Sequence, residues 1–98
     1  MKPLRIISPV EDELAAAALY YEGRSPGLGS RLVDTADAAL QEIPINPMLC
    51  HEIDPGYRQK LLRRFPFAFV YRIDPGEIVV VAFMHLRRRP GYWRGRDR

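Results

Sequence analysis

The sequence has few of the residues that carry metal and redox chemistry. It contains one cysteine, Cys50, and two histidines, His51 and His85. A single cysteine excludes an intrachain disulfide and favours a reducing cytosol. The histidines have no companion ligands at the spacing of a metal site, and neither a phosphate-binding loop nor a glycine-rich dinucleotide motif occurs. We therefore expect no bound metal and no cofactor.

Long hydrophobic runs are also missing. No stretch approaches the roughly 20 apolar residues of a membrane-spanning helix, and acidic residues follow the short apolar start too soon for a signal peptide. We therefore expect a cytoplasmic protein without a membrane partner. A length of 98 residues, 47% of them hydrophobic, fits one domain, residues 1–98, whose core needs neither disulfides nor metal.

What the sequence does have is an uneven distribution of charge. The net charge of +3 hides two halves of opposite sign. Residues 1–56 contain 4 Lys or Arg and 9 Asp or Glu, whereas residues 57–98 contain 11 Lys or Arg and 3 Asp or Glu. This asymmetry indicates an acidic or polyanionic partner for the basic half.

Two helices are predicted in the acidic half. Ser8 and Glu11, with a proline between them, have the spacing of a capping box, so Ser8 should cap a first helix. The pair Ser25-Pro26 repeats this start signal for a second helix, whose apolar stripe runs over Leu28–Ile43. The short connection between the two helices predicts an antiparallel hairpin.

The remaining segments predict strands. The short apolar run Leu4–Ile7 predicts a first strand, and residues 44–56, with three prolines, predict a loop. A period of two then predicts strands at Tyr57–Arg64, Phe67–Ile73 and Ile78–Met84. We expect an α+β fold in the order β-α-α-β-β-β. Its helical hairpin should pack on one face of a mainly antiparallel sheet and leave the other face open.

The turn at residues 74–77 predicts which side chains share the open face. If Pro75-Gly76 is a two-residue turn, Arg72 pairs with Val79, and His85 lies opposite Pro66. Alternation along the strands then places Arg72 and His85 together on the open face. A bulge at the turn would reverse this assignment.

This juxtaposition suggests a candidate nuclease site. Arginine can clamp a phosphate, and histidine can transfer a proton near neutral pH. Cleavage of RNA by its own 2′-OH needs a base, a cation and an acid, and His85, Arg72 and Tyr92 or a tail arginine could fill these roles without metal. The alternatives are that His85 is structural or merely exposed, and that Arg72 only binds a phosphate or a partner.

Two groups of basic residues should rim the same face. We interpret them as an anion-binding groove for RNA or an acidic partner; the alternative is a solvated edge kept basic against aggregation. In the tail, 87–98, only the aromatic residues are expected to dock. The residues of the two groups are Arg58, Lys60, Arg63, Arg64, Arg87, Arg88 and Arg89.

Several segments together resemble the RelE/ParE superfamily of type II toxin–antitoxin toxins, the plasmid stabilisation proteins. The most specific are FPFAFVYRI at residues 65–73 and RRRPGYW at residues 87–93. Tyr20-Tyr21-Glu22 and Pro26–Gly29 also match the helical hairpin of such toxins. The resemblance covers nearly the whole chain and implies two helices on an antiparallel sheet.

The resemblance implies a small bacterial toxin that a cognate antitoxin neutralises in a hetero-oligomer, and it leaves the target open. RelE-like members cut messenger RNA in the ribosome; Arg72 matches their strand arginine, and His85 and Tyr92 fall near their acid–base positions. ParE-like members inhibit DNA gyrase and lack this nuclease set. A third alternative is a non-toxic relative that only binds an antitoxin. Whether the chain is a metal-independent endoribonuclease or a non-enzymatic inhibitor therefore stays open.

Overall fold

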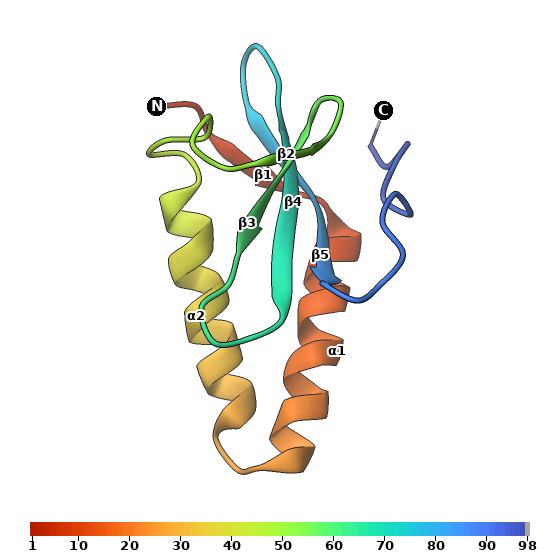
Figure 1. Cartoon of the computed structure of the whole chain (residues 1–98). Helices are drawn as coiled ribbons and strands as arrows, with labels where there is room; N and C mark the ends of the chain where they lie inside the picture. Colours follow the sequence, from red (N-terminus) through yellow and green to blue (C-terminus); the bar gives the residue numbers. More distant parts are fainter. Residues whose placement is uncertain (98) are drawn as a thin grey trace.

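The computed structural model describes residues 1–97, and places a helical hairpin against a five-stranded sheet (Figure 1). The elements are β1 (Leu4–Ile6), α1 (Ser8–Arg24), α2 (Leu28–Glu42), β2 (Glu52–Asp54), β3 (Tyr57–Leu61), β4 (Phe67–Ile73) and β5 (Ile78–His85). The strand order is β1-β5-β4-β3-β2, with β1 parallel to β5 and all other pairs antiparallel. The predicted α+β architecture is confirmed.

The sheet contains one strand that the sequence pattern did not reveal. Glu52–Asp54, in the segment expected to be a loop, pairs with β3 as the edge strand β2. Three residues with a register shift are too short to produce a visible period of two. The predicted strand at Tyr57–Arg64 is correspondingly shorter, because the chain leaves the sheet after Leu61.

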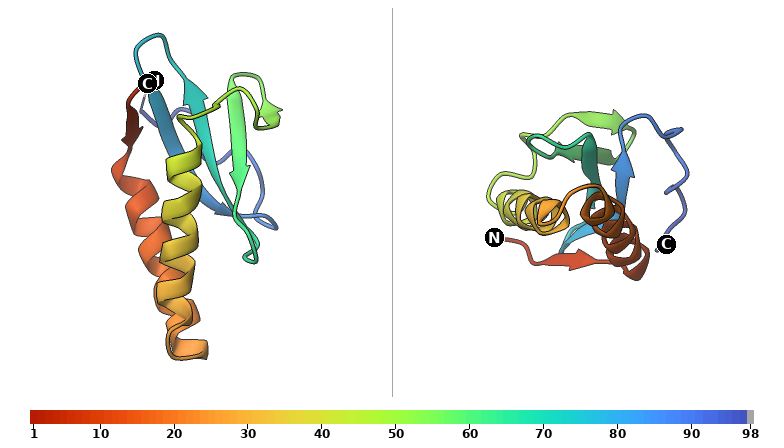
Figure 2. Two further views of the ribbon diagram at one scale, coloured as in Figure 1. Left: turned by 90° about the vertical axis from the view of Figure 1, so that its left-hand side faces the viewer. Right: turned by 90° about the horizontal axis from the view of Figure 1, so that it is seen from below.

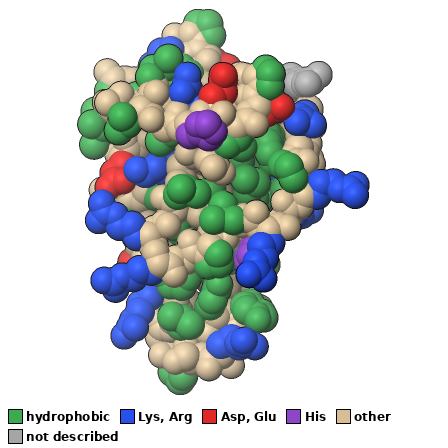
Figure 3. Space-filling model, in the orientation of Figure 1, with side chains coloured by type: hydrophobic (Ala, Val, Ile, Leu, Met, Phe, Trp, Pro, Cys, Tyr) green, Lys and Arg blue, Asp and Glu red, His purple; other side chains and the backbone are tan. Residues whose placement is uncertain are grey.

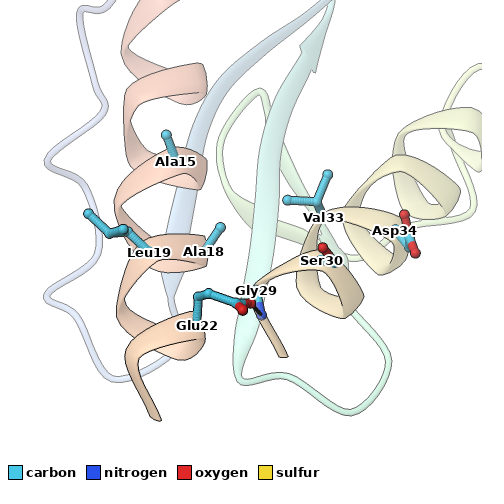
Figure 4. A pocket seen from close by; sticks show the side chains of 8 residues that line it. All are labelled: Ala15, Ala18, Leu19, Glu22, Gly29, Ser30, Val33 and Asp34. Carbon is cyan, nitrogen blue, oxygen red and sulfur yellow. Dashed lines mark hydrogen bonds between the residues drawn. The ribbon is translucent and has the colours of Figure 1, made fainter. Parts of the chain in front are cut away.

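The helix starts differ from the predicted ones. Ile7 precedes α1 and no side chain caps its first turn, so the capping box expected at Ser8 is wrong. The helix α2 begins at Leu28 rather than at Ser25-Pro26. Glu22 of α1 takes over the capping role, because its carboxylate accepts the backbone N–H groups of Gly27 at 2.9 Å and Gly29 at 3.0 Å. Figure 4 shows Glu22 reaching from α1 toward Gly29.

The two helices approach closely at Gly29. A Cβ atom at this position would lie 2.5 Å from the carbonyl oxygen of Ala18, so only glycine fits there. On its outer side the hairpin leaves a shallow groove of about 500 Å³. Neither helix among the described residues is long and apolar enough to cross a membrane.

The main core lies between the hairpin and the sheet (Figure 2). The helix α2 contributes Leu32 and Ala36, and Ile43 follows directly after it; all three are nearly inaccessible to solvent. These side chains pack with Phe69 of β4 and with β5, whose residues from 78 to 84 are all buried. Burial of each large apolar side chain stabilises the fold by about 1.5–3 kcal/mol, which is why the central strand is continuously apolar.

The second face of the sheet is not open, contrary to the prediction. Trp93 of the C-terminal tail is 1% exposed and packs with Val70, Val79 and Val81. Arginines dock the tail too, because Arg94 forms an ion pair with Asp54 at 2.7 Å. The tail runs along the outside of the molecule beside β5 (Figure 2). Arg98 lies outside the described residues.

Candidate functional site

The register between β4 and β5 decides how the predicted site residues are arranged. Arg72 pairs with Val79, as predicted, but the register shifts by one residue between Val70 and Tyr71. His85 therefore lies opposite Phe67 rather than opposite Pro66. The irregularity is a β-bulge within the strands and not at the turn.

The bulge separates Arg72 from His85. Beyond it, Phe83 stacks on Phe67 at 4.7 Å between ring centroids, and His85 lies edge-on to the same ring at 5.1 Å. These residues belong to the helix side of the sheet, whereas Arg72, paired with Val79, belongs to the tail side. The prediction that Arg72 and His85 share one face is therefore wrong, because one extra residue in β5 reverses the alternation.

Two charged side chains from distant segments hold the bulge. The backbone N–H of Phe83 donates to Oε1 of Glu13 at 3.0 Å, and Nη1 of Arg96 donates to the carbonyl oxygen of Val81 at 2.9 Å. Glu13 and Arg96 also pair with each other at 3.1 Å. Backbone groups that the irregular ladder leaves without strand partners are thus satisfied by a helix and by the tail.

Arg72 is occupied by acidic neighbours rather than open to a ligand. Its Nε donates to the Asp74 carboxylate at 3.1 Å, and its Nη2 donates to the Asp97 carbonyl oxygen at 3.0 Å. Burial lowers the pKa of Arg72, but the hydrogen bonds to Asp74 and Asp97 outweigh this and raise it above its ordinary value. The guanidinium therefore anchors the tail to the sheet.

The two remaining catalytic candidates, His85 and Tyr92, are also engaged in contacts within the fold. Nδ1 of His85 accepts the backbone N–H of Arg87 at 3.0 Å and so fixes the turn after β5. Tyr92 lies under the guanidinium of Arg88, 3.7 Å from its ring centroid, and burial together with the Glu13 carboxylate raises the pKa of its hydroxyl. Within residues 1–97, no hydrogen bond joins Tyr92 to the Arg72 guanidinium, which bonds to Asp74 and Asp97 instead.

The predicted anion-binding residues divide into two classes. Arg58 donates to the carbonyl oxygen of Cys50 at 2.8 Å, and Lys60 pairs with Glu42 at 2.7 Å, so both are engaged within the fold. The others are exposed, and their side chains form no ion pair or hydrogen bond within residues 1–97. This second class consists of Arg63, Arg64, Arg87, Arg88 and Arg89.

These five residues, which we call the basic end, lie on two loops that meet. The backbone N–H of Leu86 donates to the carbonyl oxygen of Pro66 at 2.9 Å, which joins the β3–β4 loop to the start of the tail. Arg64 adopts a left-handed φ of 69°, a strained conformation for a residue with a side chain. Figure 3 shows many Lys and Arg side chains along the lower margins of this view. The arrangement can bind a polyanion.

The part of the chain that the structure describes contains no cluster of three His, Cys, Asp or Glu side chains that could hold a metal ion. Cys50 is half-buried against the core, and His51 is exposed beside it.

The comparisons with known proteins agree with one another. The family described as ParE toxin of type II toxin–antitoxin system, parDE, matches residues 4–90. Toxin ParE2 of Mycobacterium tuberculosis, from strains CDC 1551 / Oshkosh and ATCC 25618 / H37Rv, is 32% identical over 88 residues, which cover 89% of this chain and 84% of ParE2. A solved structure described as the chromosomal ParDE TA system from P. aeruginosa shares the fold, with a TM-score of 0.65 and 16% identity over 87% of this chain and 96% of that one.

Proposed function

The chain belongs to the ParE toxin family of type II toxin–antitoxin systems, and on that premise we propose that it arrests growth by binding DNA gyrase, without cutting RNA. The separation of Arg72 and His85 carries the proposal. Metal-independent RNA cleavage needs a base and a cation at the same phosphate. Here the two side chains lie on opposite faces of the sheet, and Arg72 is engaged by Asp74 and Asp97.

The protein partner in this proposal is a cognate antitoxin, which forms a hetero-oligomer with the chain. The five exposed arginines of the basic end support an acidic segment in that antitoxin, because opposite charge steers association and fixes the register of an interface. Light scattering on the copurified pair gives the stoichiometry. If the charge reversal Arg63→Glu leaves the affinity for the antitoxin unchanged, the antitoxin binds at another surface.

The test of the target is a supercoiling assay with purified gyrase, relaxed plasmid and ATP. We expect the wild-type chain to abolish supercoiling and an equimolar amount of antitoxin to restore it. His85→Asn is the matched variant, because its amide oxygen can still accept the Arg87 N–H while the acid–base chemistry of imidazole is lost. This variant should inhibit gyrase as well as the wild type.

Mapping of RNA 5′ ends within minutes of induction separates the alternatives. Growth arrest with intact messages agrees with the proposal. New ends at fixed positions within codons, absent in His85→Asn, together with unaffected gyrase, would refute it in favour of a ribosome-dependent endoribonuclease. Harmless induction without antitoxin would instead identify a relative that only binds its antitoxin.

A further inference from the structure

We propose that the basic end binds the phosphate backbone of duplex DNA, so that the toxin contacts the DNA segment that gyrase holds as well as the enzyme. The part of this inference that involves gyrase rests on the proposed function. The binding of duplex DNA rests on the basic end alone and is tested separately.

The first argument is that some arginines have carboxylate partners and those of the basic end do not. Arg5, Arg72 and Arg96 each pair with a carboxylate of the same chain, whereas the guanidinium groups of the basic end have no such partner within residues 1–97. Clustered like charges repel one another and destabilise the compact state. A polyanion removes this repulsion and releases its own condensed counterions on binding.

The second argument is that the basic end is held in place before any ligand arrives. The Leu86–Pro66 hydrogen bond joins its two loops, and Nδ1 of His85 fixes the backbone of Arg87. The guanidinium of Arg88 lies 3.7 Å above the Tyr92 ring. A surface ordered in advance loses less conformational entropy when it binds.

The third argument favours a duplex over a single strand. Recognition of single-stranded DNA or RNA relies on open aromatic rings on which bases stack. Near the basic end, Tyr92 lies under Arg88 and Arg96, and Trp93 is buried. Phe67 stacks on Phe83 and meets the His85 ring edge-on. Phe65, in the same loop as Arg64, is half-buried and meets the Tyr21 ring edge-on. These rings are engaged within the fold, so the main chemistry that the basic end offers is guanidinium to phosphate.

The fourth argument concerns sequence preference. A protein reads base edges mainly by placing a helix or a strand pair in the major groove. The helices of this chain carry most of its acidic residues, which the phosphates flanking a groove would repel. The contact is therefore to the backbone and independent of base sequence.

The experiment is a salt titration of the full chain on a fluorescently labelled duplex of about 30 base pairs, followed by anisotropy. If each of the five arginines neutralises one phosphate, log K falls against log salt with a slope of about −4.5, which is about 500-fold between 50 and 200 mM salt. Arg63→Ala and Arg87→Ala, one from each loop, should each reduce the slope by about 0.9. Lys2→Ala is the control, because it removes one charge beside Asp74, at the other end of β4.

Several outcomes overturn the inference. A slope weaker than about −1, or Arg63→Ala and Arg87→Ala behaving like Lys2→Ala, would exclude backbone contact by the basic end. Tighter binding to single-stranded RNA of equal length would assign the surface to RNA. Circular dichroism melts of the variants confirm that each is folded.

The two proposals fail separately. Duplex binding with the expected slope, but undisturbed supercoiling, would refute gyrase as the target and keep the DNA contact. Full inhibition of gyrase by Arg63→Ala and Arg87→Ala combined would refute the role of the DNA contact and keep gyrase.

Discussion

Removal of the Glu13 carboxylate should loosen the bulge in β5 and the tail together. This carboxylate accepts both the N–H of Phe83 and the guanidinium of Arg96. Glu13→Gln keeps an acceptor for the Phe83 N–H and loses only the charge. The side chains of Arg96 and Glu13 are 24% and 17% exposed, so loss of their ion pair should lower the free energy of unfolding by about 1 kcal/mol. Glu13→Ala also leaves the Phe83 N–H unsatisfied, so its cost should be about 3 kcal/mol.

The tail provides the signal for this measurement. Trp93 is the only tryptophan, so its fluorescence during urea unfolding reports the docked tail, while circular dichroism reports the helices. Asp12→Asn, which changes an exposed neighbour in the same turn, is the control and should stay within about 0.5 kcal/mol of wild type. Equal stability of Glu13→Gln and Glu13→Ala would refute the assignment of Glu13 as the partner of the bulge.

Three further changes test other parts of the structure. Trp93→Ala should cost about 3 kcal/mol, because it empties the packed tail side of the sheet, and urea unfolding followed by circular dichroism measures this. Gly29→Ala should cost about 1–3 kcal/mol, since the new methyl group meets the Ala18 carbonyl oxygen, and a thermal melt that matches wild type would contradict this close approach. The hydrogen bond from Arg5 lowers the pKa of Asp97. This carboxylate therefore stabilises the docked tail above its ordinary pKa of about 3.9 and ceases to do so as pH falls through the lower folded value. Trp93 emission between pH 5 and pH 2 should follow this loss, and in Asp97→Asn the change should be smaller.

The sequence predicts those parts of the fold that depend on local periodicity. The run Ile78–Met84 is buried and the stripe over Leu28–Ile43 is buried or half-buried, as expected. One face of a helix and both faces of a central strand must be apolar to pack. The bulge could not be predicted. Its partners, Glu13 and Arg96, are charged residues far away in the sequence, and no local pattern links them to β5.

The candidate site shows the same division between local and distant information. Composition located the basic half, but it could not distinguish Arg58 from Arg63. The difference lies in what surrounds each one, because Arg58 reaches loop carbonyl oxygens and Arg63 reaches solvent. Asp97 accepts hydrogen bonds from the Arg72 guanidinium, but nothing in the sequence predicts this pairing. A single acidic residue among arginines is equally typical of a solvated tail.

The parallel pairing of β1 with β5 has a kinetic consequence. Leu4 lies opposite Ile78, so this contact closes a loop that spans most of the chain. Short connections let β3, β4 and β5 associate early, whereas pairing between distant segments slows folding. Until β1 arrives, β5 presents an unpaired apolar edge, which is a template for self-association. We therefore expect the addition of β1 to be the late, slow step of folding and the stage at which the chain aggregates most readily.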